Sequence, residues 1–145
     1  MKINLILTVV VLSIVNGARS DDMYESEHFP PCHRWIKCSG QDQAALDEFD
    51  GCLDKVPEEK MKKFLKMMAD FAKEEWSDLD EAYNEYCVWD EVRQNEYFVE
   101  VLQLFMDEYS ETCADSLQFG TCNKMTDNGG CFVDVINRVH AEEKC

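Results

Sequence analysis

The clearest periodic pattern of apolar residues lies between positions 57 and 76. Apolar side chains recur there at intervals of three and four, so they share one stripe of a helix, and charged residues take the opposite side. The stripe consists of Met61, Phe64, Leu65, Met68, Phe71, Ala72 and Trp76. Pro57 suits the first helical position, and Glu58 and Glu59 suit the positive end of the helix dipole. The pattern predicts an amphipathic core helix over 57–76.

The run that begins with this helix is too long to be a single straight element. Positions 58–119 contain no glycine and no proline, and a helix of that length would be longer than a domain of this size is wide. We therefore expect the run to fold back on itself. Ser77 reads as an N-cap and predicts the first break, local polarity at 93–95 predicts a second, and Gly120 is expected to end the last segment.

The two ends of the chain carry shorter signals. Pro30-Pro31 favours extended backbone, and positions 32–38 fit a helical turn held by cysteines. A first helix is expected over 41–55 with Ser39 as its N-cap, and a last short helix over 132–139 after a turn at 126–130. No stretch predicts a strand. The fold class expected is all-α, a compact bundle of about five helices.

Residues 1–20 have the pattern of a secretory signal peptide. Lys2 precedes an apolar core that is too short to span a bilayer, and small residues allow cleavage after Gly17 or after Ser20. We expect residues 21–145 to form a single domain that is secreted, with a loose acidic tail over 21–27.

Eight cysteines lie in the expected mature chain. They are Cys32, Cys38, Cys52, Cys87, Cys113, Cys122, Cys131 and Cys145. An even number of cysteines in a small exported chain predicts four disulfides, and eight cysteines allow about a hundred pairings, among which the sequence does not choose. Together with the signal peptide, they favour an oxidising, extracellular location.

The chain is strongly acidic, with 14 basic and 30 acidic residues and a net charge of −16. Removal of residues 1–20, which contain two of the basic residues, leaves 12 against 30, a net charge of −18. Such a surface repels nucleic acid and anionic membranes. The departure from this charge is one edge of the 57–76 helix, where Lys62, Lys66 and Lys73 predict a contact face for a partner; the alternative is a solvated face paired with acidic neighbours.

The residues give no support for catalysis or for a cofactor. There is no G-x-S-x-G elbow, no H-E-x-x-H and no phosphate-binding loop. His28, His33 and His140 are expected to be solvated rather than to bind a metal. Asp78 and Asp80 hint at a calcium loop, but the position that needs glycine there is Tyr83, so they are expected to begin a helix. We expect a protein that is not an enzyme.

Methionine and aromatic residues allow two interpretations of the interior. They either pack into an ordinary core or line an apolar cavity for a small molecule. The residues concerned are Met61, Met67, Met68, Met106, Phe64, Phe71, Phe98, Phe105 and Trp76.

The cysteine spacing matches no specific motif. Insect odorant-binding proteins share the eight-residue gap seen between Cys113 and Cys122, but their three-residue gap between two cysteines does not occur here. In class, the chain resembles small cysteine-rich secretions of arthropod venom or salivary glands. That resemblance implies a toxin-like protein that binds an extracellular protein target, and the second hypothesis is an extracellular carrier of a hydrophobic small molecule.

Overall fold

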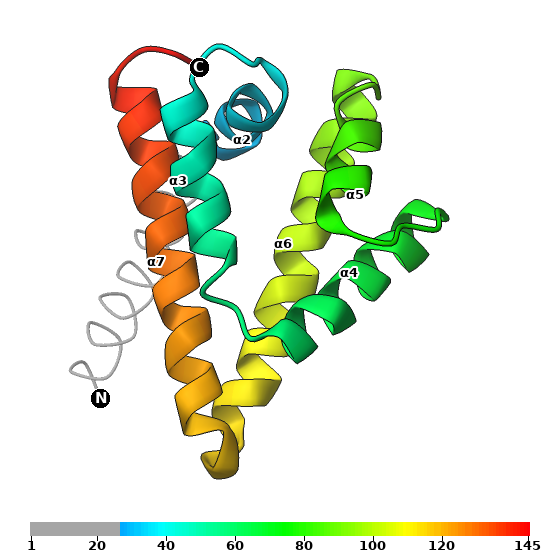
Figure 1. Ribbon diagram of the computed structural model, residues 1–145, viewed down its shortest axis with the longest axis vertical. Helices are drawn as coiled ribbons and strands as arrows, with labels where there is room; N and C mark the ends of the chain where they lie inside the picture. The colour runs from blue at the N-terminus through cyan, green and yellow to red at the C-terminus, as the bar shows by residue number, and fades with distance from the viewer. Residues whose placement is uncertain (1–26) are drawn as a thin grey trace, which may run out of the picture.

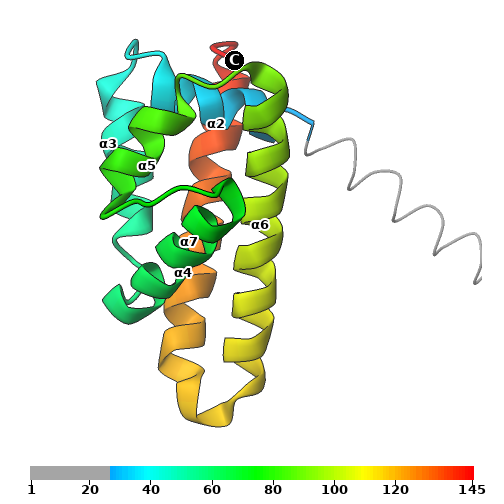
Figure 2. The ribbon, with the colours of Figure 1, turned by 90° about the vertical axis from the view of Figure 1, so that its right-hand side faces the viewer.

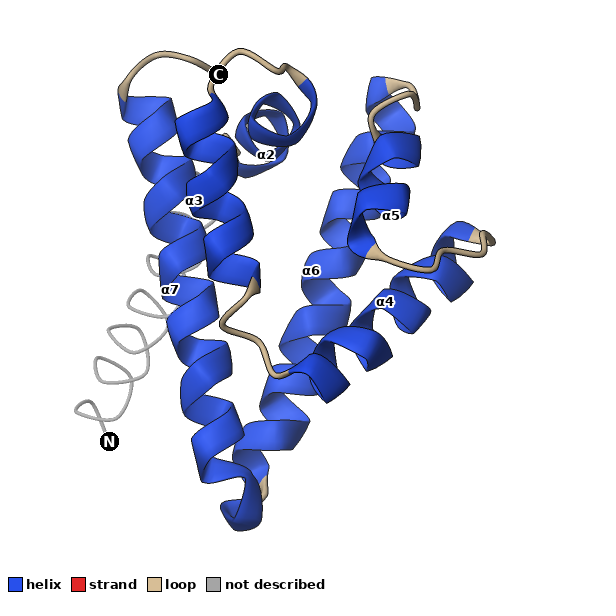
Figure 3. Cartoon of the chain, viewed as in Figure 1, coloured by secondary structure: helices blue, strands red, loops and turns tan. Residues whose placement is uncertain are grey.

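The computed structural model of the protein describes residues 27–145 and is helical throughout. Six α-helices and one 3-10 turn occur in this part of the chain, and no strand does (Figure 3). They are α2 (Phe29–Cys38), α3 (Gln43–Leu53), α4 (Glu58–Ala72), α5 (Leu79–Tyr86), α6 (Glu91–Ala114), η1 (Ser116–Gln118) and α7 (Phe119–Ala141). The all-α class is confirmed, with one helix more than expected. The predicted signal peptide, over 1–20, lies outside the described residues.

Two arms diverge from a hairpin formed by α6 and α7 (Figure 1). The first arm is α7 with α3 packed along it, and the second arm is α6 with α4 packed obliquely against it and α5 near its upper end (Figures 1 and 2). Helix α2 packs against both α6 and α7 at the end opposite the hairpin. The arms are therefore bridged at both ends, by η1 at one and by α2 at the other.

Aspartates begin three of the helices. The carboxylates of Asp42, Asp78 and Asp90 accept hydrogen bonds from the backbone N–H groups of Ala45, Glu81 and Arg93, at 3.0, 2.9 and 3.0 Å. An N-cap accepts the otherwise unpaired N–H groups of the first turn, and a negative side chain also suits the helix dipole.

From the sequence, two of these three helices were expected to begin at serines, and the third was expected to begin later in the chain than it does. Ser39 and Ser77 precede the aspartates that cap α3 and α5, and the expected break at 93–95 comes one turn earlier, at Asp90. The expectation that Asp78 begins a helix is confirmed.

The two prolines of α2 correct a second expectation. Pro30 and Pro31 lie in the first turn of the helix rather than in extended backbone. Proline is tolerated there because the first N–H groups of a helix have no partner within it. The helical turn expected at 32–38 is consequently part of a longer helix.

Helix α7 corrects the largest error in the expected elements. It runs unbroken through Gly120, which was expected to end a segment, and through 126–130, which was expected to be a turn. Composition is only a weak indication of local structure, and tertiary contacts override it here. Asn128 is buried and donates a 2.8 Å hydrogen bond from its amide nitrogen to the Cys52 carbonyl, and Cys131 is bonded to Cys52.

The main core lies in the first arm and beneath α2. Its fully buried side chains come from α2, α3 and α7: Cys32, Ile36, Ala45, Phe49, Cys52, Val135, Ile136 and Val139. Met68, Tyr86 and Tyr97 form a second cluster in the other arm, with Trp76 and Trp89 packed against it.

Helix α4 is therefore not the helix around which the main core is built. It begins after Pro57, which caps it, and ends at Ala72, before Trp76. Only Met68 and Ala69 are buried, and the ring of Phe71 is 44% exposed. A one-sided apolar stripe predicts which face is covered but not how completely a neighbour covers it.

The four disulfides connect the elements that frame the space between the arms. Cys32–Cys145 joins α2 to the end of the chain, and Cys38–Cys87 joins α2 to the end of α5. Cys52–Cys131 ties α3 to α7, and Cys113–Cys122 closes the hairpin of α6 and α7. All eight cysteines are paired, as expected. Within residues 27–145, no helix has the length and apolar character needed to cross a membrane.

Candidate functional site

An apolar cavity of about 230 Å³ lies between the two arms. Each of the six helices contributes at least one residue to its wall. Its wall consists of Phe29, His33, Leu53, Phe64, Met68, Tyr83, Tyr97, Phe98, Val101, Leu102, Phe105, Met106, Asn128, Gly129, Phe132 and Val133. Aliphatic and aromatic carbon dominates this wall, as is typical of sites for small apolar molecules.

The cavity opens between α6 and α7. Three of its apolar side chains are substantially exposed: Leu102 at 40%, Met106 at 48% and Val133 at 37%. The remaining apolar wall residues are buried or half-buried. We call these three residues the rim. They are the part of the apolar wall that water reaches.

The sequence identified part of the wall. Met68, Met106, Phe64, Phe98 and Phe105 line the cavity, whereas Phe71 and Trp76 belong to the second arm outside it, and Met67 is not part of the wall. Met61 lines a smaller hollow of about 30 Å³ that shares Phe64 and Phe105 with the cavity. The wall residues of α7, from Asn128 to Val133, were missed because that stretch was expected to include a turn.

His33 is a buried polar residue of the wall, contrary to the expectation of a solvated histidine. Its Nδ1 lies 3.3 Å from the Tyr86 hydroxyl and its Nε2 lies 3.4 Å from the Tyr83 hydroxyl. The pKa of His33 is lowered to about 3, chiefly by burial, and the positive charges of Lys37 and Arg34 contribute in the same direction. The ring is therefore neutral at physiological pH and presents no charge to the cavity.

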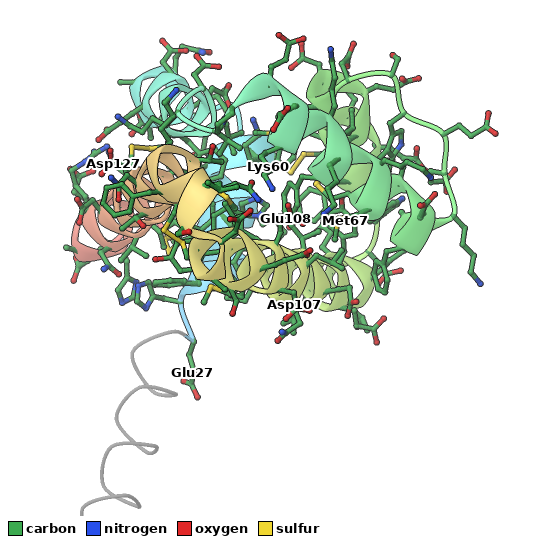
Figure 4. All side chains as sticks on the ribbon, turned by 90° about the horizontal axis from the view of Figure 1, so that it is seen from below. Glu27, Lys60, Met67, Asp107, Glu108 and Asp127 are labelled. Atoms are coloured by element: carbon green, nitrogen blue, oxygen red, sulfur yellow. A yellow bond between two sulfur atoms is a disulfide. The ribbon has the colours of Figure 1, made fainter. Side chains whose placement is uncertain are left out.

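A buried ion cluster between α4 and α6 contributes to the wall of the smaller hollow (Figure 4). Lys60 donates to Glu108 at 2.7 Å and to the Thr112 hydroxyl at 3.0 Å, and Lys63 also pairs with Glu108. Burial raises the pKa of Glu108, but the hydrogen bonds from the two lysines outweigh burial and leave that pKa below its usual value. The carboxylate is thus ionised and its charge is compensated within the protein.

The lysines of the expected contact face have partners on their own helix. Lys62 pairs with Glu58 at 2.6 Å and Lys66 pairs with Asp70 at 2.8 Å, and both lysine side chains are 75% exposed. Lys73 caps the end of α4 in a left-handed conformation, with φ of 61°. This edge of α4 therefore carries acidic as well as basic side chains. The lysines that do connect helices, Lys60 and Lys63, were not part of the predicted contact face.

Metal-ligating residue types do not assemble into a usable site in the described part of the chain. The one group of three such residues within 4.8 Å is Cys32, His140 and Cys145, and its two sulfur atoms form a disulfide. His28 and His140 stack on each other with ring centres 4.1 Å apart, and His28 lies 2.7 Å from the Asn137 side-chain oxygen. These two rings have contacts that need no metal.

Comparison with protein-family models, with curated proteins and with solved structures finds no match for this chain.

Proposed function

We propose that this chain is an extracellular protein that binds a small apolar molecule in the cavity between its arms. The observation that carries the proposal is the cavity itself. Every described helix contributes to its wall, and the surface of that wall is mostly apolar. An interior of this size left empty forfeits contact between its walls. An apolar occupant would restore those contacts and remove its own surface from water.

The volume bounds the size of the molecule. An apolar protein cavity of about 150 Å³ accommodates benzene, so a cavity of 230 Å³ suits a molecule of about nine or ten non-hydrogen atoms. A ligand of that size typically reaches a dissociation constant in the micromolar range. The open rim would also let a longer chain extend from the cavity into water.

The disulfides support a location outside the cell. Four such bonds, one of which ties the last residue to α2, persist where the surroundings are oxidising. The predicted signal peptide leads to the same proposal. The excess of acidic residues disfavours nucleic acid and anionic membranes as partners.

Binding of an extracellular protein, as by a venom or salivary toxin, is the alternative that the sequence favoured. Its expected contact face, Lys62, Lys66 and Lys73, is less well supported by the geometry than the cavity. Exposed ion pairs within a helix leave little net positive potential for a partner, and they contribute little to stability.

A homologous series of straight-chain hydrocarbons and methyl ketones tests the proposal through the melting temperature of the oxidised protein. A ligand that binds only the folded state raises that temperature. At equal ligand concentrations, we expect the rise in melting temperature to increase with chain length up to about ten non-hydrogen atoms and then to level off. A series that leaves the melting temperature unchanged at every length would refute a carrier function.

A further inference from the structure

Aromatic rings are concentrated in the wall of the cavity. Seven of its sixteen residues are phenylalanine or tyrosine, and His33 adds an eighth ring. Phenylalanine, tyrosine and tryptophan together make up 11% of the whole chain. Of the eight buried residues that form the main core, Phe49 alone is aromatic, and most of the others are aliphatic. The main core is thus chiefly aliphatic, whereas half of the cavity wall consists of rings.

These rings form two groups along the cavity. In the first group, the centre of the His33 ring lies 5.0 Å from that of Phe98 and 6.2 Å from that of Phe132. In the second group, Phe64 and Phe105 meet edge to face with ring centres 5.9 Å apart. Phe98 and Phe105 are two helical turns apart on α6, a rise of about 10 Å. Rings therefore lie near both ends of the part of α6 that lines the cavity.

A wall of this kind binds an aromatic ligand more tightly than an aliphatic one of the same size. The faces of aromatic rings are negative and their edges are positive, so two rings attract each other beyond the effect of burying apolar surface. Edge-to-face and offset-stacked pairs both have this attraction, so it does not depend on which side a wall ring turns to the ligand. Each such pair strengthens binding by about two- to twelvefold. An aliphatic ligand gains from burial alone.

The charges around the cavity favour a neutral ligand. None of the sixteen wall residues is charged at neutral pH, since the ring of His33 is neutral there, so an anion would have no counter-ion in the wall. Aromatic rings can also hold cations. However, the Lys37 ammonium already lies 4.0 Å from the centre of the Tyr83 ring, and its charge acts on His33 together with that of Arg34. A cationic ligand would be repelled from that end of the cavity.

We propose that the ligand of the cavity is a neutral aromatic compound of about ten non-hydrogen atoms, the size of two fused rings, rather than an open hydrocarbon chain. The inference rests on the proposed function, because it concerns the class of molecule that the same cavity binds.

The test compares naphthalene with decahydronaphthalene, its fully hydrogenated form. The two molecules have the same skeleton of ten carbon atoms, and the saturated one is the more voluminous, so burial of apolar surface alone gives naphthalene no advantage. Both are volatile, and their depletion from the gas phase above a solution of the oxidised protein gives each dissociation constant directly. The variants are Phe98→Leu and Phe105→Leu, one for each group of rings. The control is Phe71→Leu, whose ring is 44% exposed and lies outside the cavity.

We expect the wild type to bind naphthalene at least about fivefold more tightly than decahydronaphthalene. Phe98→Leu and Phe105→Leu should each lower this preference by about threefold, because leucine keeps the wall apolar but removes one ring. Phe71→Leu should keep the preference of the wild type. Use of the ratio of the two dissociation constants cancels any general loosening of the cavity, and either variant alone reports on its own group of rings.

Two results would overturn the inference. Equal or tighter binding of decahydronaphthalene by the wild type would show that the cavity selects its ligand by apolar surface alone. A preference for naphthalene that both Phe98→Leu and Phe105→Leu leave unchanged would show that the preference does not come from these rings. In both cases the wild type still takes up the hydrocarbons, whereas failure to take up either of them would refute the proposed function as well.

Discussion

Replacement of Glu108 by alanine should destabilise the protein by about 3–5 kcal/mol. The carboxylate is 5% exposed and pairs with Lys60, whose side chain is 13% exposed. Without Glu108, the Lys60 ammonium is left between α4 and α6 with no opposite charge, and this unpaired buried charge is the source of the expected loss. The free energy of unfolding from urea denaturation of the oxidised protein measures the change.

Two variants separate charge from packing in that experiment. Lys63→Ala removes the half-exposed lysine of the same cluster, and we expect it to cost at most about 1 kcal/mol. The double variant Glu108→Leu with Lys60→Met replaces both charges by apolar groups and should recover most of the loss. A double variant as unstable as Glu108→Ala would indicate that the ion cluster contributes through shape or through Thr112 rather than through compensated charge.

Acidification should destabilise the protein through His33 before the carboxylates titrate. The pKa of His33 lies near 3 in the folded protein and near 6.5 in the unfolded chain, so the unfolded chain binds one more proton across that window. Stability is therefore complete above pH 6.5 and falls as the pH decreases, by about 1.4 kcal/mol per pH unit, or about 2 kcal/mol by pH 5. The free energy of unfolding measured at half-unit steps over this range reports the slope.

The matched variants for the pH experiment are His33→Gln and His140→Gln. Glutamine keeps a donor and an acceptor for the two tyrosine hydroxyls but does not titrate, so His33→Gln should lose the slope between pH 6.5 and 5. His140 is exposed, and its replacement controls for the loss of a histidine that is not buried. Carboxylates whose pKa is lowered, such as Glu108, withdraw their stabilisation only as the pH falls below about 4.3. An unchanged slope in His33→Gln would mean that a group other than His33 causes the loss of stability in this range.

The sequence predicted the features that depend on neighbours along the chain. The periodicity over 57–76 identified α4, and the capping signal at Ser77 placed the start of α5 within one residue of its N-cap, Asp78, because an amphipathic stripe and an N-cap are local arrangements. The even number of cysteines identified the four disulfides. Their pairing needs the three-dimensional fold, since Cys32 meets Cys145 only after α7 returns along α3.

The features that were missed depend on contacts between distant segments. Residues 126–130 have a turn-like composition, yet they are helical because Asn128 and Cys131 are fixed to α3. His33 has no sequence signal that separates it from a solvated histidine, because the tyrosines that bury it lie about fifty residues away. The cavity wall combines all these segments, so the sequence identified only five of its sixteen residues.

Two adjacent glycines of α7 allow a direct test of the proposal that a small apolar molecule binds in the cavity between the arms. Gly129 lines the cavity, Gly130 is exposed and does not, and an added Cβ at either position meets no atom within 4 Å. Leucine has a higher helix propensity than glycine, so Gly129→Leu and Gly130→Leu should both fold. The leucine at position 129 would occupy part of the cavity, whereas the leucine at position 130 would lie outside it.

The measurement is the dissociation constant of a fluorescent apolar probe for the oxidised wild type and for these two variants. We predict that Gly129→Leu weakens binding by about tenfold or more, which corresponds to about 1.4 kcal/mol, and that Gly130→Leu binds within about twofold of the wild type. Equal binding by the wild type and Gly129→Leu, with both variants as stable as the wild type, would contradict the account, because the probe would then bind somewhere other than the cavity between the arms.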